Sequence, residues 1–289
     1  MQKSLFIGLV THPRSRFIDA SGSDGLAAGL ARELSSLGWD VQTTIVSENL
    51  VDASELDLSP RGILQSIRQE MEVERRWARF QRERSPLSRM AHTAVLRSRE
   101  VFRFWKFLRP TPSARKSAEQ TLLRLANIET AHMSLMRAGA AHGSQWILIL
   151  EDDARAPDYQ QLAQEFNEKL DSWNTSTQPS YVNLSQSFAL DAIKVDRTLT
   201  AVGPWSSAST VLSSSIPFTN TVCAVLYRRE FLQTLNEEME GIHLQPIIPI
   251  DWKLNLALMG LHTKALIRPG DCYTVDPAPI VQGSMLNQG

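Results

Sequence analysis

Two short apolar runs restrict the fold of this chain more than any other feature. Residues 5–10 (LFIGLV) and 146–150 (WILIL) contain no charged residue. A strand of this kind is apolar on both faces, which is typical of the central strands of a parallel sheet that helices cover on both sides. The sequence therefore predicts an α/β fold with a mostly parallel, Rossmann-type sheet sandwiched by helices.

The segments around these runs alternate between helical and strand patterns. Residues 26–37 have helical spacing and end before Gly38, a residue suited to a helix C-terminus, and residues 41–47 alternate like a strand. Strand, helix and strand in this order predict a right-handed βαβ unit. Further expected elements are helices at residues 117–142 and 158–173, a short strand at 180–185, a strand and helix within 221–235, a helix starting within 248–261, a last strand at 263–269, and loops or edge strands at 198–217.

Length and composition fit a single domain spanning residues 1–289. Hydrophobic residues make up 43% of the chain and charged residues 21%, and the formal net charge is −1. A net charge this close to zero gives no overall attraction to nucleic acid or to a membrane. Cys223 and Cys272 have no metal-binding or redox spacing, which fits a reducing cytoplasm, and Cys223 is expected to serve packing. No apolar run approaches about 20 residues, so no bilayer-spanning helix is expected.

Residues 61–116 differ from the rest of the chain in their charge. The stretch carries thirteen arginines and two lysines, opposed by few acids, with aromatic residues interleaved among them. We interpret it as a basic helical insertion within the domain. Two roles remain open: a solvated helical pair whose aromatic residues dock on the core, or a peripheral contact with the anionic inner face of a membrane. Nucleic acid is not expected as a partner, because no recognised binding motif accompanies the basic residues.

Three adjacent acids, Glu151, Asp152 and Asp153, follow the second apolar run directly. Two carboxylates about 4 Å apart repel by about 1 kcal/mol in water and by about 4 kcal/mol at the effective dielectric near a protein surface. A divalent cation would convert this repulsion into ligation. The alternative is that one of the acids caps the following helix, with Pro157 in its first position. A cap, however, needs one carboxylate and not three.

The position of the acids suggests a ligand site, because open α/β sheets bind ligands beyond the carboxyl ends of their strands. A receiver domain would place magnesium-binding acids here, but the chain has no later phosphoacceptor aspartate at a strand end and no Lys-Pro pair. A metal-dependent phosphatase or nuclease would need several histidine and aspartate ligands, and the six histidines have no paired ligand spacing. Both classes are therefore disfavoured.

Four blocks of sequence resemble the GT-A glycosyltransferases of family 25, the lipopolysaccharide biosynthesis type. They are NIETAHMSLMRAGAAHGSQWILILEDDA, in which a helix with a Ser-His-like step precedes the acidic strand end, TNTVCAVLYRREFLQTL, PIDWKLN and PAPIVQGS. The blocks occur in the family's order, and the resemblance covers roughly residues 1–17 and 125–285, with the basic insertion outside it.

This resemblance implies a metal-dependent transferase, inverting in its stereochemistry, that moves a sugar from a nucleotide-sugar donor to a glycan or lipid-linked acceptor. The cofactor is then Mn²⁺ or Mg²⁺, hard ions that carboxylate oxygens suit. By analogy with the family, Asp153 is the direct metal ligand, Glu151 ligates the metal through water, and Asp152 faces the donor ribose.

The resemblance also assigns donor and catalytic roles. In the loop THPRSRF, Thr11, Arg14 and Arg16 are the expected donor-binding residues, with an arginine on the donor phosphate; two solvated arginines are the alternative. Asp251 in PIDWKLN is the candidate general base for the acceptor hydroxyl. Its place after Pro249 is also compatible with a helix N-cap, and the two roles do not exclude each other.

The acceptor side and the third metal ligand are less defined. His132 and Ser284 are the candidate acceptor-binding residues, although the spacing of His132 also fits a buried core histidine. Many GT-A enzymes have a histidine metal ligand near the C-terminus, whereas this chain has no histidine after His262. Asp276 or Gln282 is the possible substitute.

Two rival functions follow from the same sequence. The segment SGSDGLAAGLARELSSLGWDVQTTIV also resembles the opening of a GT-B glycosyltransferase, which requires two full Rossmann domains and makes no use of the acids. A noncatalytic α/β module that uses the basic insertion to hold a membrane or a partner is the rival from another class.

Overall fold

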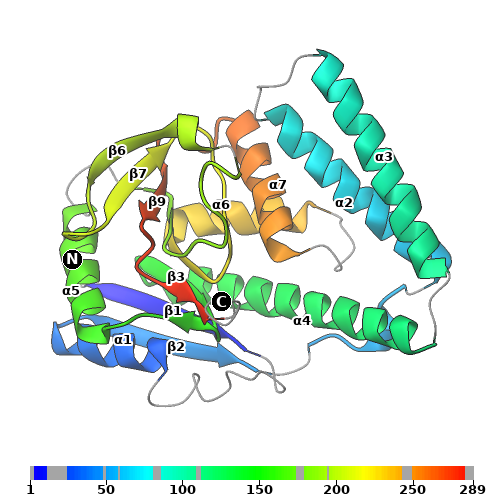
Figure 1. The fold of residues 1–289 in the computed structure, drawn as a ribbon. Coiled ribbons are helices and arrows are strands. Elements are labelled where there is room, and N and C mark those ends of the chain that lie inside the picture. The colour runs from blue at the N-terminus through cyan, green and yellow to red at the C-terminus, as the bar shows by residue number, and fades with distance from the viewer. Residues whose placement is uncertain are drawn as a thin grey trace.

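The computed structural model describes residues 3–11, 25–47, 50–57, 59–80, 86–108, 112–173, 179–193, 195–242 and 249–283 (Figure 1). Its helices are α1 (Leu26–Ser36), α2 (Pro60–Phe80), α3 (Pro86–Leu108), α4 (Pro112–His142), α5 (Tyr159–Trp173), α6 (Arg229–Glu240) and α7 (Ile250–Thr263), with short 3₁₀ helices at Ala53–Glu55 and Asp196–Thr198. Its strands are β1 (Ser4–Val10), β2 (Asp40–Val46), β3 (Trp146–Glu151), β4 (Ala154–Arg155), β5 (Tyr181–Asn183), β6 (Leu199–Pro204), β7 (Thr210–Ser214), β8 (Ala224–Arg228), β9 (Cys272–Asp276) and β10 (Val281–Gln282).

A mixed, mostly parallel sheet of eight strands forms the centre of the fold, in the order β2-β1-β3-β8-β5-β9-β7-β6. Strands β2, β1 and β3 run parallel, and so do β5 and β9, whereas β8 and β7 run antiparallel to their neighbours. The predicted α/β fold with a Rossmann-like sheet is confirmed. One large sheet collects all the described strands except β4 and β10, which contradicts the two Rossmann domains of the GT-B alternative.

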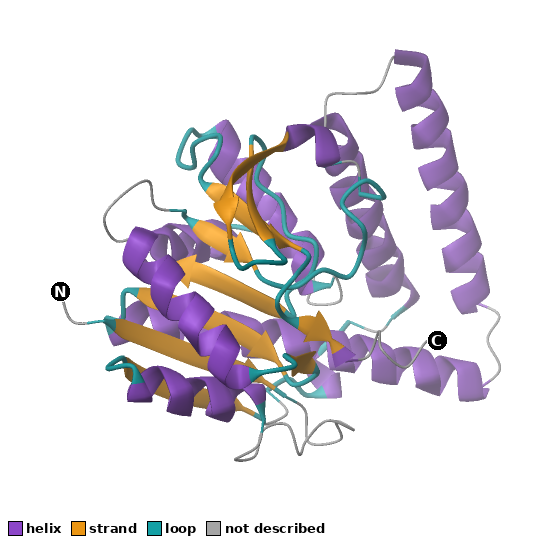
Figure 2. Ribbon diagram, turned by 60° about the vertical axis from the view of Figure 1, so that its left-hand side comes forward, coloured by secondary structure: helices purple, strands orange, loops and turns teal. Residues whose placement is uncertain are grey.

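The two central apolar strands send alternate side chains into two separate cores. Leu5, Ile7 and Leu148 pack with the helices α1 and α5, while Phe6 and Ile147 pack with α4, α6 and α7. Helices therefore cover both faces of the sheet (Figures 1 and 2). This arrangement explains why these strands have no polar alternation, since neither face meets water.

Close approach of α4 to the sheet depends on a glycine. A Cβ atom built on Gly139 would lie 2.7 Å from Cγ2 of Ile147 on β3, nearer than side chains tolerate. The helix α4 therefore lies directly against β1 and β3, and this contact fixes the position of its inward-facing residues relative to the end of β3.

The basic insertion is helical, as predicted, and forms the hairpin α2–α3 together with the start of α4. Helix α2 packs on α7, and α3 packs on α2 at the outer edge of the molecule (Figures 1 and 2). Leu96 of α3 is buried, but Val101, Phe102 and Trp105 are exposed to 69%, 63% and 52%. The interpretation in which the aromatic residues dock on the core is therefore wrong for Phe102 and Trp105.

The structure tests the predictions for two peripheral segments. Residues 198–217 contain the strand β6, which lies at the edge of the sheet as predicted, and the strand β7, which lies between β6 and β9. The strand predicted at residues 263–269 is wrong: α7 continues to Thr263, and a turn with Ala265 at φ 55° follows it. Ile267 accounts for the apolar pattern there. It lies in this turn, and its side chain is buried in the core beside α4, α6 and α7. Among the described residues, no helix combines the length and apolarity that crossing a bilayer requires.

Candidate active site

The three acids lie at the carboxyl end of β3, where the strand leaves the core. Residues Trp146 to Leu150 are buried, and the register pairs Val10 of β1 with Glu151 of β3. The backbone N–H of Glu151 donates to the carbonyl of Cys223, just before β8, at 2.9 Å. The acids therefore stand between the ends of two neighbouring segments and face the edge of the sheet where ligands bind.

Asp152 contacts the residue that follows β1. The hydroxyl of Thr11 donates to Oδ2 of Asp152 at 2.8 Å, and both belong to the predicted donor-binding set. The Thr11 N–H also donates to the carbonyl of Val46 at 3.0 Å, which holds the end of β1 against β2. Arg14 and Arg16, the other predicted donor-binding residues, lie outside the described residues.

Glu151 and Asp153 form a compact group with a residue that the sequence had indicated as packing. The ligand atoms of Glu151, Asp153 and Cys223 all lie within 4.8 Å of one another, and this group could hold a metal ion. Burial, together with the Glu151 and Asp153 carboxylates, raises the pKa of the Cys223 thiol well above its usual value. The protonated thiol donates to Oδ1 of Asp153 at 3.6 Å. Cys223 therefore orients the Asp153 carboxylate through its thiol hydrogen.

The residues on α4 and α7 approach Glu151 from the other side. Nε2 of His132 lies 3.3 Å from Oε1 of Glu151, and His132 is only 2% exposed. This exposure does not support the predicted direct contact between His132 and an acceptor. We assign His132 to orienting Glu151 instead, which is the core role that its helical spacing also allowed.

Asp251 lies in the first turn of α7, close enough to Glu151 and His132 for their charges to affect it. Burial raises the pKa of Asp251 to about 6; the N–H of Trp252 lowers this pKa, the Glu151 carboxylate raises it, and His132 lowers it. The N-cap residue of α7 is Pro249, so the prediction that Asp251 is the N-cap is wrong. The candidate base thus lies beside the acidic group with a pKa suited to proton transfer near neutral pH.

A buried ion pair, which sequence reasoning missed, holds α7 against α4. Nζ of Lys253 lies 2.5 Å from Oε1 of Glu129, and both side chains are almost fully buried. Burial raises the pKa of Glu129, and Lys253 opposes the rise. Glu129 precedes His132 by one helical turn and Lys253 follows Asp251 by two residues, so this pair sets how the two site residues meet. The sequence did contain a signal for this pair, because Glu129 and Lys253 each interrupt the apolar pattern of a helix.

The C-terminal segment closes the site next to Asp153. The N–H of Gly283 donates to the carbonyl of Asp153 at 2.6 Å, and β10 pairs with β4. Gln282 accepts a hydrogen bond from Ser187 at 2.7 Å, and Asp276 accepts one from Gln186 at 3.4 Å. Within the described residues Asp276 is not part of the acid and thiol group. Ser284, a predicted acceptor contact, lies outside the described residues.

The helix-capping alternative for the acids is wrong. The helix α5 begins at Tyr159, and Oδ1 of Asp158 accepts the N–H of Gln161 at 2.9 Å, so Asp158 supplies the cap. Pro157 consequently lies before the helix and not in its first position. None of the three acids is needed at this helix terminus, so helix capping does not explain why they are present.

Neither a family model nor a curated protein matches this chain. The resemblance to family 25 therefore depends on the four sequence blocks alone.

Proposed function

We propose that this protein is a metal-dependent GT-A glycosyltransferase, similar to family 25, that transfers a sugar from a nucleotide-sugar donor to a glycan or lipid-linked acceptor with inversion. The observation that supports this most directly is the meeting of three features at one sheet edge. A carboxylate pair suited to a divalent cation, Glu151 and Asp153, lies beside Asp251, a carboxyl with a raised pKa. Asp152, held by Thr11, completes the group.

The donor atoms fit Mn²⁺ or Mg²⁺ better than a soft metal. Glu151 and Asp153 provide two carboxylate oxygens, the ligand type that hard ions prefer, and Cys223 is the third member of the group. Bound there, such an ion would neutralise charge that develops on a leaving nucleoside diphosphate. The thiol hydrogen bond to Asp153 and the imidazole contact to Glu151 would keep both carboxylates oriented for it.

Donor binding in this proposal falls to the end of β1. Thr11 fixes Asp152 by a hydrogen bond to one of its two carboxylate oxygens, Oδ2. A carboxylate held in this way is suited to accept hydrogen bonds from a ribose. Arg14 and Arg16 follow Thr11 in the sequence and are proposed to pair with the donor phosphates.

Proton removal falls to Asp251. Inverting transfer needs a base that takes the proton of the acceptor hydroxyl as the oxygen attacks the anomeric carbon. With a pKa of about 6, Asp251 is mostly deprotonated at neutral pH and still basic enough to accept this proton. The buried pair Lys253–Glu129 holds α7, and with it Asp251, at a fixed place relative to Glu151.

We also propose that the enzyme works in the cytoplasm. The two cysteines described, Cys223 and Cys272, are free and buried, as expected in a reducing compartment.

The proposal is tested by incubating the protein with a panel of nucleotide sugars, with Mn²⁺ or with a chelator, and measuring release of the nucleoside diphosphate. We expect release from one donor class, present with Mn²⁺ and absent with chelator. The matched control is Asp158→Asn, which changes a nearby acid but keeps a good helix cap, and it should behave as the wild type. If no donor is cleaved and none raises the melting temperature, the noncatalytic module is favoured instead.

A further inference from the structure

The α2–α3 hairpin concentrates positive charge in a protein that is almost neutral overall. Residues 60–108 contain twelve basic residues and five acids, a net charge of +7, whereas the whole chain carries −1. Within α3 (Pro86–Leu108) there are five basic residues and a single acid, Glu100. A helix of this charge attracts anionic surfaces.

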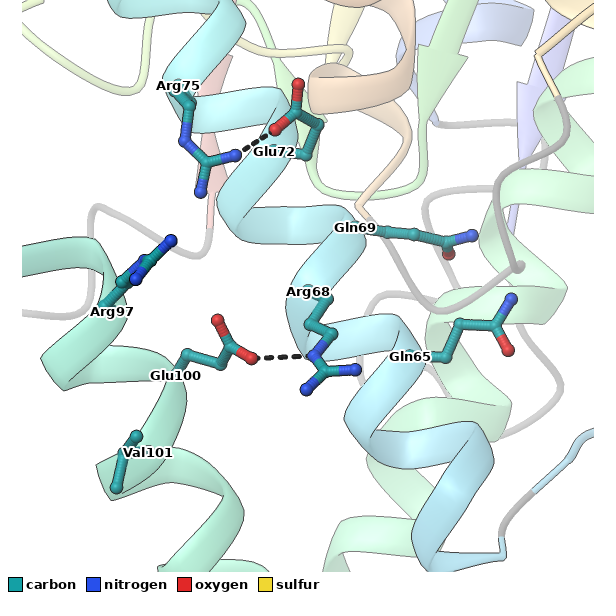
Figure 3. Close-up of a pocket in the computed structure, with 8 residues that line it drawn as sticks. All are labelled: Gln65, Arg68, Gln69, Glu72, Arg75, Arg97, Glu100 and Val101. Carbon is teal, nitrogen blue, oxygen red and sulfur yellow. Dashed lines mark hydrogen bonds and ion pairs between the residues drawn. The ribbon is translucent and has the colours of Figure 1, made fainter. Parts of the chain in front are cut away.

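Arginines pair with three of the five acids of the hairpin, Glu72, Glu74 and Glu100, and basic residues remain in excess. Oε1 of Glu100 lies 2.8 Å from Arg68, and Oε1 of Glu74 lies 3.2 Å from Arg99. Glu72 pairs with Arg75. The Arg68–Glu100 and Arg75–Glu72 pairs line a groove of about 730 Å³ between α2 and α3 (Figure 3).

Arg97 is different from these arginines. Figure 3 shows its guanidinium pointing into the groove without a partner among the residues drawn. Within the described part of the chain it makes no ion pair. Its charge is therefore available to an external anion.

Beside Arg97, α3 exposes several large apolar side chains. Met90 is 71% exposed, Val95 50%, Val101 69%, Phe102 63% and Trp105 52%. Val101, Phe102 and Trp105 line a shallow groove of about 560 Å³ together with Arg97 and Ser98. One helix thus presents large apolar side chains and an unpaired guanidinium side by side, which is the composition of a helix that lies in a membrane interface.

We propose that α3 docks on an anionic phospholipid membrane, with Arg97 on a lipid phosphate and with Val101, Phe102 and Trp105 inserted at the level of the headgroups. The net charge of +4 on α3 matches the negative surface of such a membrane, and Trp is favoured in its interface. A second copy of the chain fits this surface poorly, because a symmetric contact would bring two helices of net charge +4 together.

The hairpin also links the membrane contact to the candidate base, an inference that rests on the proposed function. Helix α2 packs on α7, the helix that carries Asp251. Docking through α3 would therefore hold the candidate base near the membrane, where a lipid-linked acceptor resides.

The test is sedimentation of the full-length protein with vesicles of pure phosphatidylcholine and with vesicles containing about 30% phosphatidylglycerol. We expect binding to the anionic vesicles at about 50 mM salt, at least about tenfold stronger than to the neutral ones and weakened by about 500 mM salt. The double variant Phe102→Glu/Trp105→Glu should lose about tenfold or more of this binding, as should Arg97→Glu to a smaller degree.

Leu266→Glu is the matched control, because Leu266 is 57% exposed and lies after α7 and not on the hairpin. It should bind vesicles as the wild type does, and equal melting temperatures of all variants would show that they fold. The proposal is overturned if the wild type does not sediment with anionic vesicles, if the double variant binds as well as the control, or if α3 instead mediates dimerisation or binding to an RNA oligomer without vesicle binding. The assay contains no sugar donor, so its failure is distinct from failure of the proposed glycosyl transfer.

Discussion

The acids of the α2–α3 hairpin and the acids at the end of β3 have different partners. In the hairpin, arginines of the protein itself lie on acids such as Glu74 and Glu100. At the sheet edge, the contacts described for the acids include a hydroxyl on Asp152, a thiol on Asp153 and an imidazole on Glu151. An arginine cancels the charge of a carboxylate, whereas a hydroxyl or thiol orients it. The two regions therefore differ in the groups that contact their acids, and at the sheet edge Glu151 and Asp153 lie close enough together to hold a metal ion.

Asp153→Asn should have the largest effect, and only on activity. The change keeps the shape of the side chain but removes the negative charge proposed to hold the cation, so transfer should fall by about a thousandfold or more. Stability should stay equal or rise, because one source of carboxylate repulsion is lost. Steady-state kinetics and thermal melting of the same preparation check both parts. Activity within about tenfold of the wild type would contradict a metal role for Asp153.

Lys253→Met should have the next largest effect, on stability. It leaves Glu129 buried without its counter-charge, and breaking a buried pair in this way typically costs about 3–5 kcal/mol. Chemical denaturation measures the loss. The control is the double variant Lys253→Met/Glu129→Leu, which should recover most of the stability because no uncompensated charge remains. A single variant as stable as the wild type would show that the pair does not hold α7 on α4.

Asp251→Asn should change how turnover depends on pH. As a base, Asp251 must be deprotonated, so wild-type turnover should rise with pH up to about 6 and then level off. The variant should be slower by about a hundredfold, with no dependence on pH in this range. Rate profiles between about pH 4.5 and 8 decide the point. A wild-type profile that is flat through pH 6 would argue against Asp251 as the base.

The raised pKa of the Asp251 carboxyl also predicts that the folded state loses stability as pH rises. Because the pKa of Asp251 is raised in the folded state, its contribution to stability is full below the unfolded pKa and is lost as pH rises through about 6. Asp251→Asn removes this dependence. In the presence of chelator, the variant should therefore gain stability over the wild type above pH 6, by an amount on the order of 3 kcal/mol. Denaturation curves at low and neutral pH measure the difference.

Arg68→Ala should have the smallest effect. Arg68 pairs with Glu100 at 2.8 Å, but its side chain is 63% exposed, and exposed pairs typically contribute less than about 1 kcal/mol. Its free energy of unfolding should therefore change far less than that of Lys253→Met. A loss as large as that of the buried pair would remove the distinction between the two kinds of ion pair.

The sequence predicted the central part of the fold well because burial leaves a direct pattern. Residues 5–10 and 146–150 are apolar on both faces because two cores lie on either side of them, and this alone identified central strands. The strand predicted at residues 263–269 failed because the burial of Ile267 does not reveal that its backbone forms a turn. The direction of β8 also has no signature in the sequence.

The candidate site was predictable only in part for the same reason. The acids were found because they follow an apolar strand, and Thr11 was found because its segment resembles the donor-binding loop of the family. The structure does bring Thr11 and Asp152 together. The place of Cys223 beside Asp153 depends on β8 lying antiparallel to β3, which local sequence does not determine. The sequence does not show that Cys223 lies next to Asp153, so the apolar residues around Cys223 indicated only a packing role.

The central claim is that Glu151 and Asp153 hold a divalent cation for a pyrophosphate group, and calorimetric titration of Mn²⁺ tests it most directly. With a nucleoside diphosphate present, the wild type and Asp158→Asn should bind one Mn²⁺ per chain with equal affinity, while Asp153→Asn should lose about a hundredfold or more. Equal binding by Asp153→Asn, or no binding by the wild type with any nucleoside diphosphate, would contradict the account.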